Sequence, residues 1–156
     1  RTVRVMKSLL IVYHSQSGAS ASLARAACRG ARGEAGVSVG LCRTWDAGIE
    51  DLRAADGLLL LAAENSGALS GGMKDFLDRV FYPAIDASLV LPYALLLSAG
   101  NDGRGAQRQA ERILSGIPFT AATETLILRG EVTVEHRQAS EELGRAFAAG
   151  LVMGIF

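Results

Sequence analysis

The fold is decided by one stretch near the N-terminus, Leu9-Leu10-Ile11-Val12-Tyr13-His14-Ser15-Gln16-Ser17-Gly18-Ala19-Ser20. It opens with an uninterrupted apolar run, which is typical of a strand buried on both faces of a parallel sheet. Hydroxyl side chains and a glycine follow, and then comes an alanine-rich stretch that ends before Gly33. The segment therefore predicts a buried strand, a polar loop and the first turns of a helix.

The same alternation continues along the chain. Further strands are predicted at Val37–Leu41, Leu58–Ala62, Tyr93–Leu97 and within Thr125–Leu128. Helices are predicted at Ala19–Arg32, Ile49–Ala54, Met73–Ala87, Arg104–Leu114 and Ala139–Met153. Strands that alternate with helices form right-handed βαβ units around a parallel sheet. We therefore expect an α/β fold of one domain over residues 1–156, with a five-stranded parallel sheet and helices on both faces. Residues 1–5 look like an extension upstream of a natural start at Met6.

Composition narrows the classes of function. Hydrophobic residues make up 49% of the 156, and the 16 basic and 16 acidic residues cancel. A neutral chain lacks the basic footprint of a nucleic-acid-binding protein, and no apolar run approaches the ~18 residues of a membrane span. Cys28 and Cys42 are isolated, without a histidine at metal-ligand spacing. We expect no metal site, no nucleic-acid or membrane partner, and a reduced, cytoplasmic setting.

Glycine and hydroxyl residues gather where the predicted strands end. In open parallel sheets, ligands bind beyond the carboxyl ends of the strands. Three loops at this edge supply the candidate ligand-binding residues. They are Ser15, Gln16, Ser17, Gly18, Ala19 and Ser20 after the first strand; Glu64, Asn65, Ser66, Gly67 and Ala68 after the third; and Ala99, Gly100, Asn101, Asp102 and Gly103 after the fourth.

The first of these loops suits a phosphate. A helix N-terminus offers unpaired N–H groups and about half a positive charge, and three serine hydroxyls add neutral donors, although the loop holds no Lys or Arg. Alternatively, Ser17 or Ser20 caps the helix and Gly18 only shapes the turn. Two other phosphate loops do not match, because no G-x-G-x-x-G is present and Met73 stands where the Walker A lysine would be.

Two motifs resemble a known family. Leu10–Gly18 is similar to the start of flavodoxins, and the pattern Gly67-x-x-Ser70-Gly71-x-Met73-Lys74-x-Phe76-x-Asp78-Arg79 resembles a signature of their NAD(P)H-dependent FMN reductase and quinone reductase branch. The resemblance implies a flavodoxin-like three-layer sandwich with strand order 2-1-3-4-5. It also implies that Ser15–Ser20 binds the FMN phosphate, and that Glu64–Ala68 and Ala99–Gly103 flank the isoalloxazine ring at the switch between the first and third strands.

Two features favour a reductase over an electron carrier. The chain is neutral, whereas acidic surfaces steer carriers to partners, and neither Glu64–Gly72 nor Ala99–Gly105 contains an aromatic residue to stack on the flavin. Losing two stacks weakens FMN binding by roughly ten- to a hundredfold and opens one flavin face. We expect NADPH or NADH to reduce FMN, which passes two electrons to a quinone, flavin or similar acceptor. The alternatives are a one-electron carrier and a non-enzymatic binding protein.

Several side chains have a structural and a functional interpretation. Backbone N–H groups in Ala99–Gly103, or Asn65, are candidates to stabilise negative charge on the reduced ring. Packing is favoured for His14 and Trp45, and solvent exposure for His136, whereas Glu64 is either a functional carboxylate or a surface residue. The aromatic pair Phe81-Tyr82 belongs to the core or, by the family resemblance, to a homodimer interface. The segment 129–137 leaves little room for a substrate lid, and no basic cluster selects NADPH over NADH.

Overall fold

The computed structural model describes residues 6–156, so the predicted extension at residues 1–5 lies outside the described part. The strands are β1 (Lys7–Tyr13), β2 (Val37–Arg43), β3 (Gly57–Asn65), β4 (Ala68–Leu69), β5 (Pro92–Ala99), β6 (Thr120–Ala121) and β7 (Leu126–Arg129). The helices are α1 (Ala19–Arg32), α2 (Ile49–Arg53), α3 (Gly71–Asp86), α4 (Arg104–Gly116) and α5 (Val134–Met153), with a 3₁₀ turn η1 (Thr44–Asp46).

The predicted sheet is confirmed. Its strands run in the order β2-β1-β3-β5-β6, and β7 also pairs with β5. The fifth position is therefore an interrupted strand: β6 pairs with the beginning of β5 and β7 with its end. This is the predicted order 2-1-3-4-5, with all central pairings parallel. The short strand β4 was not predicted. It folds back antiparallel on the end of β3.

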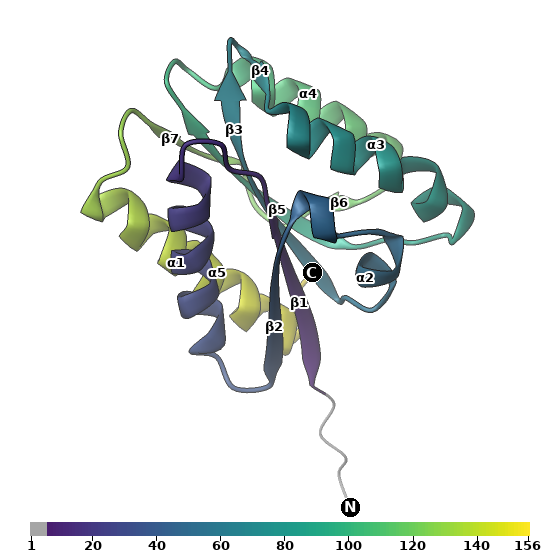
Figure 1. The fold of residues 1–156 in the computed structure, drawn as a ribbon. Helices are drawn as coiled ribbons and strands as arrows, with labels where there is room; N and C mark the ends of the chain where they lie inside the picture. Colours follow the sequence, from purple (N-terminus) through teal and green to yellow (C-terminus); the bar gives the residue numbers. More distant parts are fainter. Residues whose placement is uncertain (1–5) are drawn as a thin grey trace, which may run out of the picture.

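Helices cover both faces of the sheet (Figure 1). On one face, α1 and α5 pack against a core that includes Leu9, Ile11 and Leu59. On the other face, α2, α3 and α4 cover a core that includes Leu58, Leu60 and Phe76. Alternate residues of β3 point to opposite faces, and residues 57–62 are all buried. This explains why the central strands have uninterrupted apolar sequences.

Helices α1 and α5 lie side by side and run in the same direction (Figure 1). Ser140 Oγ donates a hydrogen bond of 2.6 Å to the carbonyl oxygen of Leu23. A Cβ atom at Gly30 would collide with the backbone of Glu141, and one at Gly144 with the backbone of Ala27. Because the two helices are parallel, both N-termini lie at the edge of the sheet where β1, β3 and β5 end.

Three predictions change: the start of α5, the setting of His136 and the packing of Trp45. Helix α5 begins at Val134 rather than Ala139, because Thr133 Oγ1 accepts a hydrogen bond from the N–H of His136 and caps a polar first turn. His136 belongs to that cap, since its Nδ1 accepts from Thr133 N–H. The packing predicted for Trp45 was wrong: its side chain follows β2 on η1 and is 61% exposed.

The described helices include none long and apolar enough to span a membrane. Cys28 is buried and Cys42 half-buried, and both are free thiols. Burial, together with the nearby carboxylates of Asp51 and Asp46, raises the pKa of Cys42 to about 11. The thiol of Cys42 is therefore protonated at neutral pH.

Candidate functional site

A cleft of about 670 Å³ opens at the carboxyl ends of β1, β3, β5 and β7. Its volume falls within the roughly 300–1,000 Å³ of ligand pockets. It is lined by Ser17, Gly18, Ala19, Ser22, Ala63, Glu64, Asn65, Ser98, Ala99, Gly100, Gly130, Glu131, Val132 and Arg137. All three loops that the sequence singled out contribute to it, at the sheet edge where ligands of open α/β folds bind.

The loop between β1 and α1 leaves its helix end open. Gly18 is the N-cap residue of α1, in the left-handed region at φ 97°, and no side chain of the described residues caps the helix. Ser15 Oγ instead accepts a hydrogen bond of 3.0 Å from Gly18 N–H, which shapes the turn. The alternative that Ser17 or Ser20 caps α1 is therefore wrong. The first N–H groups of α1 are free to bind an anion.

A buried hydroxyl adds to this open end. Ser20 is 2% exposed, and its Oγ has no hydrogen-bond partner among the described residues. It lines a small hollow of about 120 Å³ that connects the loop to the end of β3. A buried polar atom without a partner costs about 1–3 kcal/mol. A phosphate oxygen at this position would accept its hydrogen bond, so the loop fits the phosphate of FMN.

Glu64, at the end of β3, braces the loop between β5 and α4. Its carboxylate accepts hydrogen bonds from the N–H groups of Asn101 (3.0 Å) and Gly103 (2.9 Å). The sequence analysis offered the backbone N–H groups of residues 99–103 as donors to the reduced ring. Two of these N–H groups already donate to Glu64, so they are not available to the ring. Glu64 also lines the cleft. It therefore holds a loop and carries a negative charge beside the ligand space.

The turn between β3 and β4 is also held in place by contacts with its neighbours. Ser66 and Gly67 have φ values of 52° and 78°, as the two-residue turn of a tight hairpin requires. Gln109 of α4 accepts a 2.9 Å hydrogen bond from Leu69 N–H through its side-chain oxygen. A Cβ atom at Gly105 would collide with the carbonyl oxygen of Gly67. The hairpin of β3 and β4 thus packs directly on α4.

The structure divides the predicted binding residues into three groups. The large cleft brings together Ser17, Gly18, Ala19, Glu64, Asn65, Ala99 and Gly100. The smaller hollow adds Ser15, Gln16 and Ser20. Neither space is lined by Ser66, Gly67, Ala68, Asn101, Asp102 or Gly103. The side-chain amide of Asn65 donates to that of Gln16 at 3.2 Å, linking the first and third loops.

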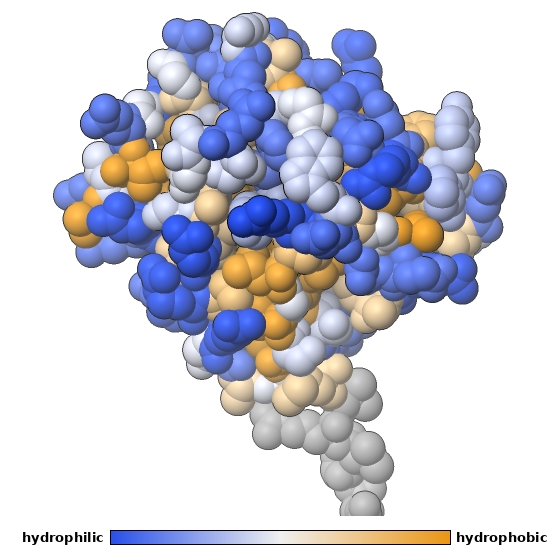
Figure 2. All heavy atoms as spheres, viewed as in Figure 1, coloured by the Kyte–Doolittle hydropathy of each residue, from blue (hydrophilic) through white to orange (hydrophobic). Residues whose placement is uncertain are grey.

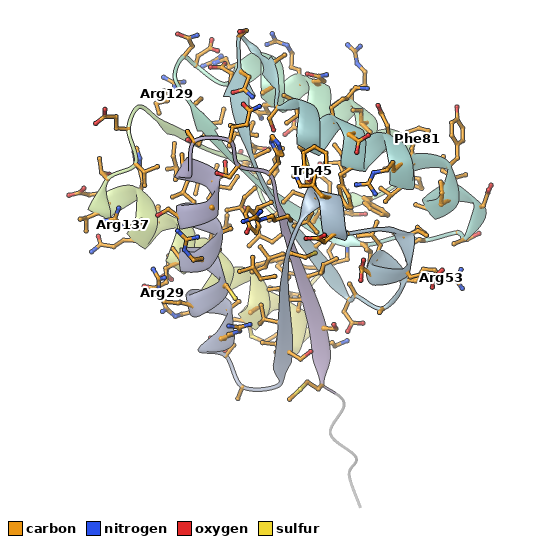
Figure 3. The ribbon with its side chains drawn as sticks, viewed as in Figure 1. Arg29, Trp45, Arg53, Phe81, Arg129 and Arg137 are labelled. Atoms are coloured by element: carbon orange, nitrogen blue, oxygen red, sulfur yellow. The ribbon has the colours of Figure 1, made fainter. Side chains whose placement is uncertain are left out.

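The sequence analysis missed the fourth wall of the cleft. Gly130, Glu131, Val132 and Arg137 line it from the segment between β7 and α5. Arg137 is half-buried and forms no salt bridge within the described residues. Figure 3 shows Arg137 in the first turns of α5, beside α1. These residues could have been predicted to line the cleft. They follow the fifth strand, and all strands of a parallel sheet end at the same edge.

His14 is buried directly after β1, as predicted for a residue placed by packing. Its ring meets Trp45 edge-on at 5.5 Å between centroids, and it lies where a Cβ atom at Gly72 would be. Burial lowers the pKa of His14 below its usual 6.5, so the imidazole is neutral at pH 7. Its Nδ1 has no hydrogen-bond partner among the described residues.

Residues 15–136 match the model of the NADPH-dependent FMN reductase family. The chain belongs to this family. It is also similar to a flavodoxin from Aquifex aeolicus (strain VF5), with 26% identity over 92% of this chain and 86% of that protein. This family membership makes FMN the cofactor and NADPH the implied electron donor.

Solved structures show the same fold. A flavodoxin from the domain Archaea superposes with a TM-score of 0.81 at 19% identity, over 92% of this chain and 98% of that one. The flavodiiron core of Flv1 from Synechocystis sp. PCC6803 gives a TM-score of 0.80 at 20% identity. The match covers 95% of this chain but only 36% of that protein. The flavodoxin-like fold is thus shown both in a short protein and as part of a longer one.

Proposed function

We propose that this protein is an oxidoreductase in which NADPH reduces bound FMN and the flavin passes two electrons to a quinone, free flavin or similar acceptor. The observation that carries the proposal is the open N-terminus of α1, with the buried, unpartnered hydroxyl of Ser20 beside it. When bound, FMN supplies the hydride chemistry, and the protein supplies binding, orientation and electrostatics.

Each loop has a distinct role in this proposal. The first turn of α1 and the hydroxyls of Ser15, Ser17 and Ser20 bind the phosphate. Asn65 and Ala99 belong to the two loops that flank the ring, and Glu64 keeps these loops at a fixed separation through its two backbone hydrogen bonds. Arg137 supports the same binding mode, because it adds a positive charge to a cleft wall whose phosphate loop has none.

The open cleft favours an enzyme over a carrier. No aromatic side chain is among the residues that line the large cleft, so a flavin bound there would have no aromatic side chain stacked on it from that lining. Direct hydride transfer requires that the nicotinamide lie against that face, with the reacting atoms about 3–3.5 Å apart. An uncovered face of the flavin permits this approach.

Anaerobic titration of the FMN-loaded protein with NADPH and with NADH tests the proposal, followed by the visible absorbance of the flavin. We expect rapid bleaching to the two-electron-reduced form with NADPH, followed by reoxidation when a quinone is added. If neither nucleotide bleaches the flavin, and chemical reduction passes through a stable one-electron-reduced form, the proposal fails.

That second outcome would support a one-electron carrier. The similarity to the Aquifex aeolicus flavodoxin favours this second candidate. The neutral net charge opposes it, because carriers use charged surfaces for steering toward partners.

We also propose a homodimer through the outer face of α3. Tyr82 is 72% exposed and Ile85 40% exposed, beside a hollow lined by Phe81 and Ile113. Figure 3 shows Phe81 on this helix, away from β2. Light scattering during gel filtration tests this proposal: a dimeric mass that becomes monomeric in Tyr82→Glu supports it, and a monomeric mass for the unmodified chain contradicts it.

A further inference from the structure

A second hollow lies on the other side of the loop between β1 and α1. Its volume is about 240 Å³, and it is lined by Tyr13, His14, Ser15, Gln16, Gly18, Ala21, Arg43 and Trp45. This volume is below the roughly 300–1,000 Å³ of whole-ligand pockets, so it suits one arm of a larger ligand. Gly18 lines both this hollow and the large cleft. The two spaces are therefore neighbours across a single loop.

The side chains of this hollow suit a phosphorylated aromatic group. Trp45 is 61% exposed, and Figure 3 shows it on the outside of η1 near the end of β1. Arg43 is also exposed and donates from Nε to the hydroxyl of Tyr13 at 3.4 Å. An indole face binds planar rings, and a guanidinium binds phosphate in a two-pronged geometry.

A third, independent observation concerns His14. His14 is 6% exposed and lines the hollow, and its Nδ1 is unpartnered among the described residues. Buried polar atoms normally have a partner. Figure 2 shows hydrophilic residues across the middle of this face of the molecule and apolar residues below them.

We propose that this hollow binds the adenosine-phosphate arm of the nicotinamide dinucleotide, with Trp45 stacking on adenine and Arg43 pairing with a phosphate. Arg43 lines the same hollow as Ser15 and Gln16 of the loop between β1 and α1, so its guanidinium lies at the sheet edge where the proposed phosphate site is. Arg43 is the last residue of β2. The inference rests on the proposed function, because it gives a second site to the donor of that reaction.

Binding of adenosine 2′,5′-bisphosphate to the FMN-loaded protein tests the site directly. Calorimetry should give saturable binding that weakens about tenfold or more in Arg43→Ala, the loss of one charge-assisted contact. Trp45→Ala should weaken it less, and Trp45→Phe should recover part of that loss by keeping an aromatic face. Arg53→Ala is the matched control, because Arg53 is an exposed arginine on α2 outside the hollow (Figure 3).

Kinetics separate this inference from the proposed function. Reduced nicotinamide mononucleotide lacks the adenosine arm, so the ratio of kcat/KM for NADPH to that for the mononucleotide should fall about tenfold in Arg43→Ala and stay unchanged in Arg53→Ala. An unchanged ratio in Arg43→Ala, or no binding of the bisphosphate, would overturn the inference while reduction by NADPH still upheld the reductase. If neither donor reduces FMN but Arg43-dependent binding of the bisphosphate persists, the reductase fails and a nucleotide site remains.

Discussion

The loops on the two sides of the cleft are built in opposite ways. The loop between β1 and α1 leaves donors unused, since α1 has no side-chain cap and the buried Ser20 Oγ has no partner among the described residues. The loops after β3 and β5 use theirs internally, through the carboxylate of Glu64 and the side chain of Gln109. The first loop is unsatisfied without a ligand, whereas the others are already held in place.

From this difference we expect the loop between β1 and α1 to supply most of the binding energy for the ligand. The loops after β3 and β5 position the ligand. A region with unused donors gains stability when an anion arrives, because buried polar groups obtain partners. A region with its donors engaged offers shape and a fixed charge. Substitutions in the first region should therefore affect ligand affinity more than folding. Substitutions in the second should affect folding first.

Gly105→Ala should have the largest effect. Its Cβ would meet the carbonyl oxygen of Gly67, and backbone cannot move aside as a flexible side chain can. We expect the free energy of unfolding to fall by about 3 kcal/mol, measured by urea denaturation. The matched control is Gly18→Ala in the first loop, where no atom lies near the added Cβ and only the left-handed backbone costs about 1–2 kcal/mol. Equal losses in both variants would contradict the contrast between the two regions.

Glu64→Ala should have the next largest effect. It removes the acceptor of two backbone N–H groups, so the free energy of unfolding should fall by about 2 kcal/mol. Hydrogen exchange at Asn101 and Gly103 should become faster. Glu64→Gln keeps one side-chain acceptor oxygen and should show a smaller loss. If exchange at both amides is unchanged in Glu64→Ala, the brace does not exist in solution.

Ser20→Ala should separate binding from stability. Because the buried Oγ has no partner in the ligand-free structure, removing it removes a cost of about 1–3 kcal/mol, so the free energy of unfolding of the ligand-free protein should rise and should not fall. The dissociation constant for FMN should rise about tenfold, from the loss of one hydrogen bond to a charged phosphate. Fluorescence titration of FMN measures it, and an unchanged dissociation constant would place the phosphate elsewhere.

The smallest expected effect is a dependence of the free energy of unfolding on pH, caused by His14. Burial lowers its pKa in the folded protein below the usual 6.5, so the unfolded chain binds a proton at a higher pH than the folded one does. Its contribution to stability is complete above pH 6.5 and is lost as pH falls from there through the folded pKa. Urea denaturation between pH 5 and 8 should show this slope, and His14→Gln should reduce it. A slope unaffected by the substitution would assign it to other groups.

The fold was predictable because its signals are local. Apolar runs such as Leu9–Tyr13 and Leu58–Ala62 identify buried strands, and the order of the strands followed from the family resemblance. The start of α5 was missed because a capped but polar first turn has no hydrophobic periodicity. The hairpin of β3 and β4 was missed because Ala68–Leu69 is too short to show alternation.

The site was predicted less completely because its contacts are distant in sequence. The loops were found from their composition, but nothing in the sequence pairs Glu64 with the backbone of Asn101 and Gly103. Arg137 lines the cleft from the first turns of α5, and Arg43 lines the neighbouring hollow from the end of β2. Packing was favoured for Trp45, but the residue is exposed beside the hollow, and no local sequence pattern indicates this. The chain as a single domain and the cytoplasmic setting stay predictions.

The most direct test of the central claim compares the affinity of the apoprotein for FMN and for riboflavin, which lacks the phosphate. If the open end of α1 and its hydroxyls bind the phosphate, FMN should bind at least about 100-fold more tightly, the equivalent of two hydrogen bonds to a charged group. Ser20→Ala should reduce that ratio. Equal affinity for the two flavins would contradict the assignment of the loop between β1 and α1 as a phosphate site.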